Sequence, residues 1–191
     1  MSETPRLFPV FLKLAGRKVV VVGGGKVAAA KLAALQAAGA DITVIAPSVR
    51  SVIDVSGVHV ERRGFEPSDL DGAWYVVAAA TPAINALVAA AASARRIFVN
   101  AVDDKDHASA YLGGVLERGG VTVAFSTEGQ APAIAGLLRE GIDALLPQDL
   151  DRWVAEAESL RAQWKAEGVP LDERRRRLLD VLNKIYDKGP S

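Results

Sequence analysis

The sequence predicts an α/β protein whose first part is a parallel β-sheet covered by helices, and three observations carry this prediction. Residues 19–22 are four consecutive valines, which is typical of a strand buried on both faces. Glycines follow, and an alanine-rich helical stretch runs over residues 26–38. A second β pattern, residues 42–45, begins after Gly39, which stands where a glycine at the C-terminus of a helix is expected. Together they form a βαβ unit.

The glycines between this strand and helix predict a dinucleotide site in a Rossmann-like sheet. In the pattern Gly23-x-Gly25-x-x-Ala28, the first glycine permits a sharp turn, the second lets the backbone approach a phosphate, and Ala28 lets the helix pack closely on the strand. The helix N-terminus then faces the anion, so we expect Gly23, Gly25, Lys26 and Val27 to bind the cofactor. Glycine-rich turns after buried strands also occur where nothing binds.

The end of the second strand leaves the choice of dinucleotide open. An acidic residue for the adenosine ribose is usual about 20 residues beyond the glycines, but this chain has Ala46-Pro47-Ser48 there. Pro47, the Ser48 hydroxyl and the local backbone are the candidate contacts. NAD is favoured, yet no carboxylate would repel the 2′-phosphate of NADP, and Arg50 is close in sequence.

The α/β pattern continues to about residue 105. Strands are predicted over residues 58–61, 74–78 and 97–100, with a helix over residues 82–94 that has Thr81 as N-cap and Pro82 at its first position. Because a ligand crevice lies at the carboxyl ends of parallel strands, Thr81, Asn100 and Asp103 should lie on that edge.

From Tyr111 the pattern changes to a β-hairpin and helices. Strands are predicted over residues 111–116 and 121–125 with a turn over residues 117–120, then helices over residues 132–146, 149–167 and 172–188. A hairpin alone is marginal, and a partner subunit could cover it. The predicted organisation is a Rossmann domain over residues 1–110, a small α+β dimerisation segment over 111–147 and a C-terminal helical segment over 148–191.

Composition narrows the functional classes. Lysine and arginine together number 23, as do aspartate and glutamate, which argues against nucleic-acid binding as the main task. The absence of cysteine excludes disulfides, thiolate metal sites and a cysteine nucleophile. The first residues do not read as a signal peptide, and no apolar run is long enough for a membrane span. We therefore expect a cytoplasmic protein.

Several motifs, in order along nearly the whole chain, resemble the precorrin-2 dehydrogenase family, which includes the N-terminal module of siroheme synthases. They lie at residues 8–12 (Phe-Pro-Val-Phe-Leu), 22–28, 39–47, 79–81, 96–103 (Arg-Ile-Phe-Val-Asn-Ala-Val-Asp) and 125–132. The resemblance implies oxidation of precorrin-2 to sirohydrochlorin with NAD, insertion of ferrous iron in some members, and a homodimer built on the region after Tyr111. Methylation of the tetrapyrrole is then expected on another protein.

The resemblance also implies site residues. Asp103 occupies the position of the family's catalytic aspartate, where a carboxylate would take the proton that accompanies hydride loss. A turn-capping role is the ordinary alternative, and Asp104 and Asp106 remain neighbouring candidates. The expected substrate contacts are Asn100, Ser126, Thr127, Gly129 and Arg139. Further candidates for the carboxylates of precorrin-2, expected on or near the crevice, are Arg95, Arg96 and Lys105.

Iron insertion has less support, because His59 and His107 are the two histidines. His107, four residues after Asp103, is the candidate metal or proton partner, although a lone loop histidine is more often neither. The chain also departs from the family at residues 82–84 (Pro-Ala-Ile) and 111–114 (Tyr-Leu-Gly-Gly), where substrate contacts are expected to differ. The alternative function is a non-enzymatic, NAD-sensing Rossmann regulatory module. A short-chain reductase would need a Tyr-x-x-x-Lys pair, which no tyrosine here provides.

Overall fold

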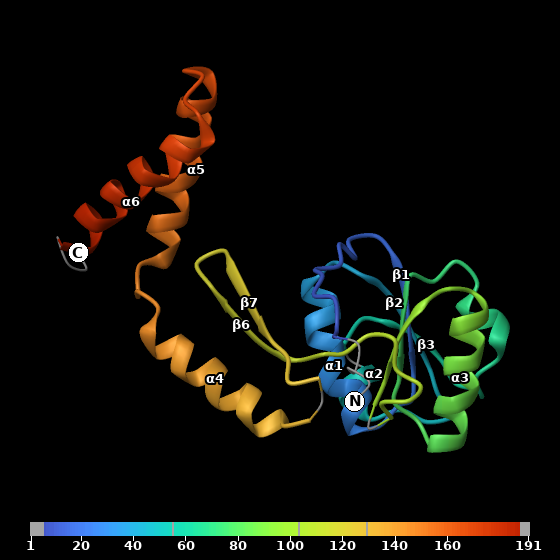
Figure 1. The fold of residues 1–191 in the computed structure, drawn as a ribbon. Coiled ribbons are helices and arrows are strands. Elements are labelled where there is room, and N and C mark those ends of the chain that lie inside the picture. The colour runs from blue at the N-terminus through green and yellow to red at the C-terminus, as the bar shows by residue number, and fades with distance from the viewer. Residues whose placement is uncertain (1–5, 55, 103, 129, 188–191) are drawn as a thin grey trace. The chain divides into compact units, whose positions relative to one another are not determined.

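A five-stranded parallel sheet in the order β3-β2-β1-β4-β5 organises the first part of the chain (Figure 1). The computed structural model describes residues 6–54, 56–102, 104–128 and 130–187, and it divides into two compact units, Met1–Leu112 and Gly113–Ser191. The elements of unit 1 are β1 (Lys18–Val22), α1 (Lys26–Ala37), β2 (Asp41–Ile45), α2 (Ser51–Asp54), β3 (His59–Glu61), η1 (Pro67–Leu70), β4 (Tyr75–Ala78), α3 (Pro82–Ala94) and β5 (Phe98–Ala101). This strand order is that of the Rossmann fold, so the predicted fold class is confirmed.

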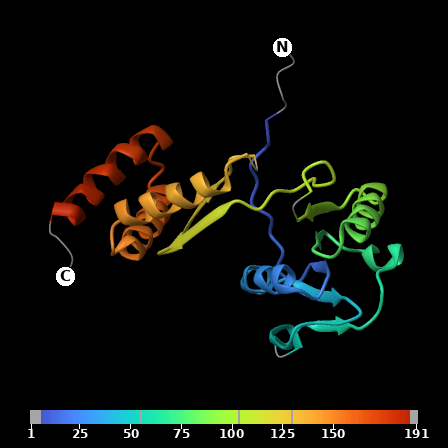
Figure 2. The same cartoon turned by 90° about the horizontal axis from the view of Figure 1, so that it is seen from below.

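The valine run of β1 is buried on both faces of the sheet, as its sequence predicts. Val19 and Val21 belong to a core with Leu32 of α1, whereas Val20 and Val22 belong to a second core with Val88 of α3. Figures 1 and 2 show α1 and α3 on opposite faces of the sheet. The alternation follows from the two-residue period of a strand, and it fixes the register of β1 between its neighbours.

Helix α1 ends at the glycine that the sequence singles out. Gly39 has a φ of +70°, and its amide donates to the Gln36 carbonyl over 2.9 Å. A residue without Cβ adopts this left-handed conformation at little cost, which lets the chain turn directly into β2. The turn brings β2 alongside β1, with Val22 paired to Ile45 at the carboxyl edge.

Two short elements, α2 and η1, are absent from the prediction because four residues are too few to show a helical period. In η1, the Asp69 carboxylate accepts a hydrogen bond from the Glu66 amide over 2.8 Å. It also accepts two hydrogen bonds from the Arg63 guanidinium, a bidentate pair at 2.6 and 2.9 Å. These bonds hold η1 in place, and Leu70 of η1 is fully buried in the core that contains Val88 of α3.

We expect the Arg63 contact to make unfolding sensitive to acid. Hydrogen bonding from the Arg63 guanidinium, opposed by burial, holds the pKa of Asp69 below its usual value. A carboxyl group with a lowered pKa stabilises the fold above its unfolded pKa of 3.8 and loses that contribution as the pH falls through its folded pKa. In urea unfolding, Asp69→Asn should lower the free energy of unfolding by about 1 kcal/mol at pH 7. The expected loss is small because Arg63 is half-exposed, and solvent screens its interaction with Asp69. The variant should match the wild type in strong acid, and equal stability of the two at pH 7 would contradict the assignment.

Unit 2 contains a hairpin and three helices: β6 (Gly114–Arg118), β7 (Val121–Phe125), α4 (Pro132–Leu145), α5 (Leu150–Ala166) and α6 (Leu171–Asp187). The predicted strand over residues 111–116 is wrong in its bounds, since Tyr111 belongs to unit 1 and its hydroxyl donates to the Lys105 carbonyl over 3.0 Å. The predicted four-residue turn is also wrong. Arg118 pairs with Val121 across a two-residue turn, in which Gly119 and Gly120 both have positive φ.

The hairpin has a covering helix within its own chain, whereas the sequence analysis named a partner subunit that could supply the cover. Helix α4 lies along the hairpin (Figure 2), with Leu116 and Ala135 buried between them. Arg118 donates to the carbonyls of Asp143 and Leu146 over 3.0 and 3.1 Å, and it also pairs with the Asp143 carboxylate. One face of the hairpin is therefore covered, and Val115 on the other face is half-exposed.

Candidate functional site

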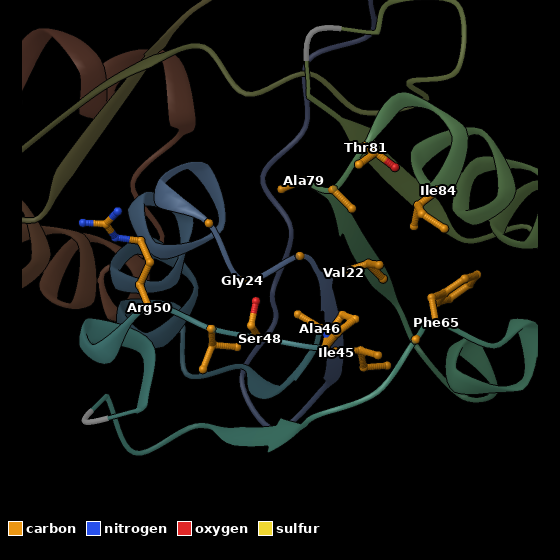
Figure 3. A pocket seen from close by; sticks show the side chains of 16 residues that line it. Val22, Gly24, Ile45, Ala46, Ser48, Arg50, Phe65, Ala79, Thr81 and Ile84 are labelled. Carbon is orange, nitrogen blue, oxygen red and sulfur yellow. The ribbon is translucent and has the colours of Figure 1, made fainter.

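A cavity of about 570 Å³ opens at the carboxyl edge of the sheet in unit 1 (Figure 3). It begins at the end of β1 with the glycine loop Gly23–Gly25, passes the segment after β2, and reaches the start of α3. Its lining residues are Val22, Gly23, Gly24, Gly25, Ile45, Ala46, Pro47, Ser48, Val49, Arg50, Gly64, Phe65, Ala79, Ala80, Thr81 and Ile84. The position between β1 and β4 is the point where strand order reverses, at which open α/β sheets bind ligands.

Each of the three positions in the loop is glycine for a different structural reason. Gly23 has a φ of +126°, and a Cβ there would lie 2.2 Å from the Ala79 carbonyl oxygen. A Cβ on Gly24 would lie 2.0 Å from the Ser48 carbonyl oxygen. A Cβ on Gly25 would meet nothing within 4 Å, so the protein itself does not require glycine at this position. Gly25 is the N-cap of α1, and open space beside its backbone fits the approach of a diphosphate.

Gly24 is a site residue that sequence reasoning missed, because the motif leaves its middle position free. Its role depends on a contact with residues 48–50, which lie far along the chain. The Gly24 carbonyl accepts the Arg50 amide over 3.0 Å while its Cα faces Ser48. Because Gly24 has no Cβ, the segment after β2 can lie against the glycine loop.

A second cavity, of about 310 Å³, adjoins the first through Ala79 and Ala80, which line both. It is also lined by Val27 at the start of α1, Pro82 and Asn85 in α3, and Val102 and Asp104 after β5. The two cavities follow the carboxyl edge from β2 to β5. An extended dinucleotide could therefore lie across the glycine loop with one end in each.

Asn85 holds the wall that the two cavities share. It is buried, and its side-chain oxygen accepts the Ala80 amide over 2.9 Å. Thr81 is the N-cap residue of α3, as predicted, but its side chain makes no capping hydrogen bond. The Asn85 side chain reaches back and satisfies the amide just before the cap.

Substitution of Asn85 by alanine should destabilise this wall. The Ala80 amide would lose its partner, which costs about 1–3 kcal/mol in urea unfolding, and we expect NAD affinity to fall as the 79–81 segment loosens. Asn183→Ala, an exposed position on α6, is the matched control and should leave both measurements unchanged. Full stability and affinity in Asn85→Ala would show that the hydrogen bond is dispensable.

The predicted cofactor residues fall into three groups. Gly23, Gly25, Pro47, Ser48 and Thr81 line the larger cavity, and Val27 lines the smaller one. Lys26 is exposed at the first turn of α1 and lines neither cavity. Figure 3 shows the Ser48 hydroxyl beside the glycine loop.

The predicted catalytic residue, Asp103, belongs to the segment that follows β5 in the sequence. Asp103 lies outside the described residues, but its neighbours Val102 and Asp104 both line the smaller cavity. Asn100 is buried, and its amide donates to the Ala110 carbonyl over 3.0 Å. Asn100 therefore ties β5 to the backbone at Ala110, and it lines neither cavity. Its expected contact with substrate stays a prediction.

His107 has a partner in Asp104, not in a metal cluster. Its Nδ1 lies 2.9 Å from Asp104 Oδ1 and 2.7 Å from Asp104 Oδ2, and Oδ1 also accepts the His107 backbone amide over 3.2 Å. Across residues 6–54, 56–102, 104–128 and 130–187, no three histidine, aspartate or glutamate side chains gather as metal ligands. The metal role of His107 therefore has no support from the described residues.

The remaining predicted substrate residues belong to unit 2. The Ser126 and Thr127 hydroxyls accept the amides of Glu128 and Ala131 over 3.1 and 3.2 Å, and so shape the turn that leads into α4. Gly129 lies outside the described residues. Arg139 lies on α4 and pairs loosely with Glu140 at 3.4 Å. These placements do not test a role in substrate binding.

The expectation that Arg95 and Arg96 lie near the crevice is wrong. Helix α3 starts at the carboxyl edge of the sheet and runs to the opposite edge, so both arginines stand just before the start of β5. There Arg95 pairs with Asp71 over 2.8 Å, a residue that precedes β4. The predicted order of strand, helix and parallel strand already implies this placement, because the helix must return to the amino edge before the next parallel strand begins.

Comparison with known proteins agrees with this geometry. The family described as "Putative NAD(P)-binding" matches residues 10–114, more than half of the chain and nearly all of unit 1. The chain belongs to this NAD(P)-binding family. The match includes the glycine loop and the lining of both cavities.

Relatives extend the match beyond unit 1. The chain is 40% identical over 197 residues to siroheme synthase 3 of Aeromonas hydrophila, covering 96% of this chain and 41% of that protein. It is 41% identical over 160 residues to the siroheme synthase of Photobacterium profundum, covering 81% of this chain and 34% of the relative. The chain thus spans about two fifths or less of the length of these relatives, and the resemblance to the siroheme synthase family is confirmed.

A solved structure supports the fold along the whole chain. SirC, a precorrin-2 dehydrogenase, superposes with a TM-score of 0.75 at 24% identity, covering 96% of this chain and 93% of that one. At this identity the likeness establishes the fold. No helix in the described part of the chain combines the length and apolar character that a bilayer crossing requires.

Proposed function

We propose that this protein is a precorrin-2 dehydrogenase, which oxidises precorrin-2 to sirohydrochlorin with NAD. The observation that carries the proposal is that the likeness to siroheme synthases covers 96% of the chain and so continues through unit 2. A module that only bound a dinucleotide would need unit 1 alone. Unit 1 supplies the cavities for the coenzyme, and unit 2 carries the predicted substrate residues Ser126, Thr127 and Arg139.

The chemistry needs a hydride acceptor and a proton acceptor. When bound, the nicotinamide of NAD supplies the first, and the diphosphate would lie on the bare backbone of Gly23–Gly25. Asp103 is proposed to take the proton, so that substrate loses a hydride and a proton and becomes sirohydrochlorin. The lining of the smaller cavity by Val102 and Asp104 supports this role, since these residues flank Asp103 in the chain.

The test is turnover of the full chain with precorrin-2 and NAD. We expect NADH to accumulate, followed at 340 nm, in step with the absorbance of sirohydrochlorin. An NAD-sensing regulatory module would bind NAD and give no turnover, and that result would reject the dehydrogenase. Ferrous iron added afterwards tests whether the protein also converts sirohydrochlorin to siroheme, as the resemblance implies.

We also propose that the protein is a homodimer that uses helix α4. Four large apolar side chains of α4 are left exposed by the hairpin, namely Ile134, Leu137, Leu138 and Leu145, which are between 50% and 78% accessible. Their spacing of three, four and seven residues places them on one stripe of the helix. Such a stripe is typical of a surface that a partner covers.

Substitution of Leu137 by aspartate should disrupt this dimer. A charge at the centre of the stripe would be desolvated on association, so light scattering coupled to size exclusion should give the mass of one chain where the wild type gives two. Leu87→Asp, at a similarly exposed leucine on α3 of unit 1, is the control and should remain dimeric. A monomeric wild type, or an unchanged mass in Leu137→Asp, would contradict the proposed interface.

A further inference from the structure

The larger cavity carries one charged side chain among the described residues that line it, and that side chain is a cation. Arg50 lies at the rim, where the segment after β2 meets the glycine loop (Figure 3). No aspartate or glutamate is among the lining residues. Ala46 follows the last residue of β2, near the place where many NAD sites have a carboxylate that binds the ribose 2′-hydroxyl.

A hydrogen bond holds the backbone of Arg50 in place, whereas its guanidinium can bind a ligand. The Arg50 amide donates to the Gly24 carbonyl over 3.0 Å, and this bond holds the Arg50 backbone against the glycine loop. The guanidinium makes no hydrogen bond or ion pair with any residue in the described part of the chain. Figure 3 shows it extending from the rim, away from the apolar wall at Ile45 and Phe65. A ligand phosphate that remained at the rim would be within the range of such a side chain.

The acidic residues in the neighbouring segments already have cationic partners. Asp54 of α2 pairs with Arg62. Glu61, at the end of β3, lies 2.7 Å from His59 and 3.7 Å from Arg63. Arg62 offsets the charge of Asp54, and Arg63, which also binds Asp69, offsets part of the charge of Glu61. The rim near Ser48 and Arg50 retains a net positive charge.

We propose that this site accepts NADP as well as NAD, and that Arg50 binds the 2′-phosphate of NADP with help from the Ser48 hydroxyl. The inference rests on the proposed function, because it concerns the same coenzyme cavity. A guanidinium offers a planar pair of donors that fits two phosphate oxygens. A carboxylate at this place would repel the phosphate, and its absence removes the usual means of excluding NADP.

The experiment is calorimetric titration of the full chain with NAD and with NADP at one low, fixed ionic strength. We expect the wild type to bind both coenzymes. Arg50→Gln should shift the ratio of the two dissociation constants about 10- to 100-fold toward NAD, the change expected on losing charge-assisted hydrogen bonds. Ser48→Asp should shift the ratio in the same direction by introducing the missing carboxylate. Arg161→Gln, an exposed arginine on α5, is the matched control for loss of one positive charge and should leave the ratio unchanged.

The outcomes separate this inference from the function on which it rests. Binding of NAD but not NADP by the wild type, or an unchanged ratio in Arg50→Gln, would overturn the role of Arg50 and leave the dehydrogenase proposal intact. Binding of neither coenzyme would overturn both. Because Arg50 and Ser48 are exposed, circular dichroism melting of the variants should match the wild type, and the ratio then reports on the site itself.

Discussion

Asparagine in place of Asp103 is expected to reduce precorrin-2 oxidation by about 10²- to 10⁴-fold while NAD still binds. An amide matches the carboxylate in shape but does not accept a proton near neutral pH, so the variant should lose the proton-transfer step alone. The measurements are the initial rate of NADH formation under saturating precorrin-2 and NAD, and the dissociation constant of NAD by calorimetry.

The neighbouring carboxylates provide the controls for this prediction. Asp106→Asn changes an exposed residue that lines neither cavity, and it should retain activity. Asp104→Asn is the sharper comparison, because Asp104 lines the smaller cavity and binds His107. If Asp104→Asn lost activity and Asp103→Asn kept it, the proton acceptor would be Asp104, and the residue carried over from the family motif would be wrong.

Alanine at Gly24 is expected to abolish NAD binding and lower stability. The added Cβ would lie 2.0 Å from the Ser48 carbonyl oxygen and 2.8 Å from Val49 Cα, and both obstacles are backbone atoms that do not rotate away. The glycine loop and the segment after β2 would have to separate, which breaks the bond between Gly24 and Arg50. We expect a loss of about 1–3 kcal/mol in urea unfolding, as for an overpacked buried site, and no measurable NAD binding.

Two other glycines distinguish steric damage to the protein from steric exclusion of the ligand. Gly25→Ala should fold with nearly wild-type stability, because its Cβ meets nothing within 4 Å, yet it should weaken NAD at the point where the diphosphate approaches the backbone. The control is Gly141→Ala on α4, which also meets nothing within 4 Å and lines neither cavity, so it should leave NAD affinity unchanged. Wild-type NAD affinity in Gly24→Ala would show that the two segments do not need to touch.

The parts of the site that depend on local sequence were predictable. The four valines of β1, the turn at Gly23 and the helix end at Gly39 each follow from the conformations that these residues prefer, and neighbouring residues are enough to specify them. The position of Thr81 at the start of α3 was predictable for the same reason, because Pro82 tolerates only the first turn of a helix.

The parts that depend on distant contacts were not predictable. No local pattern indicates that the Asn85 side chain satisfies the Ala80 amide before α3, or that Arg118 reaches the end of α4. The covering of the hairpin by α4 was missed because a hairpin face shows only that something apolar must lie on it. The misplaced Arg95 is a different kind of error, because a helix between two parallel strands ends at the amino edge, and the predicted order of elements was enough to place Arg95 there.

By itself, the sequence determined a strand, a glycine turn and a helix that suit a dinucleotide, because backbone preference and hydrophobic periodicity act over a few residues. Only the tertiary structure decided that Gly24 must lack a Cβ, and that two adjoining cavities meet at Ala79 and Ala80. It also decided that the Arg50 guanidinium lies at the cavity rim with no partner among the residues that the structure describes. These features arise where strands far apart in the chain end at one sheet edge. Their contacts are set by packing in three dimensions, which the local preferences of residues do not encode.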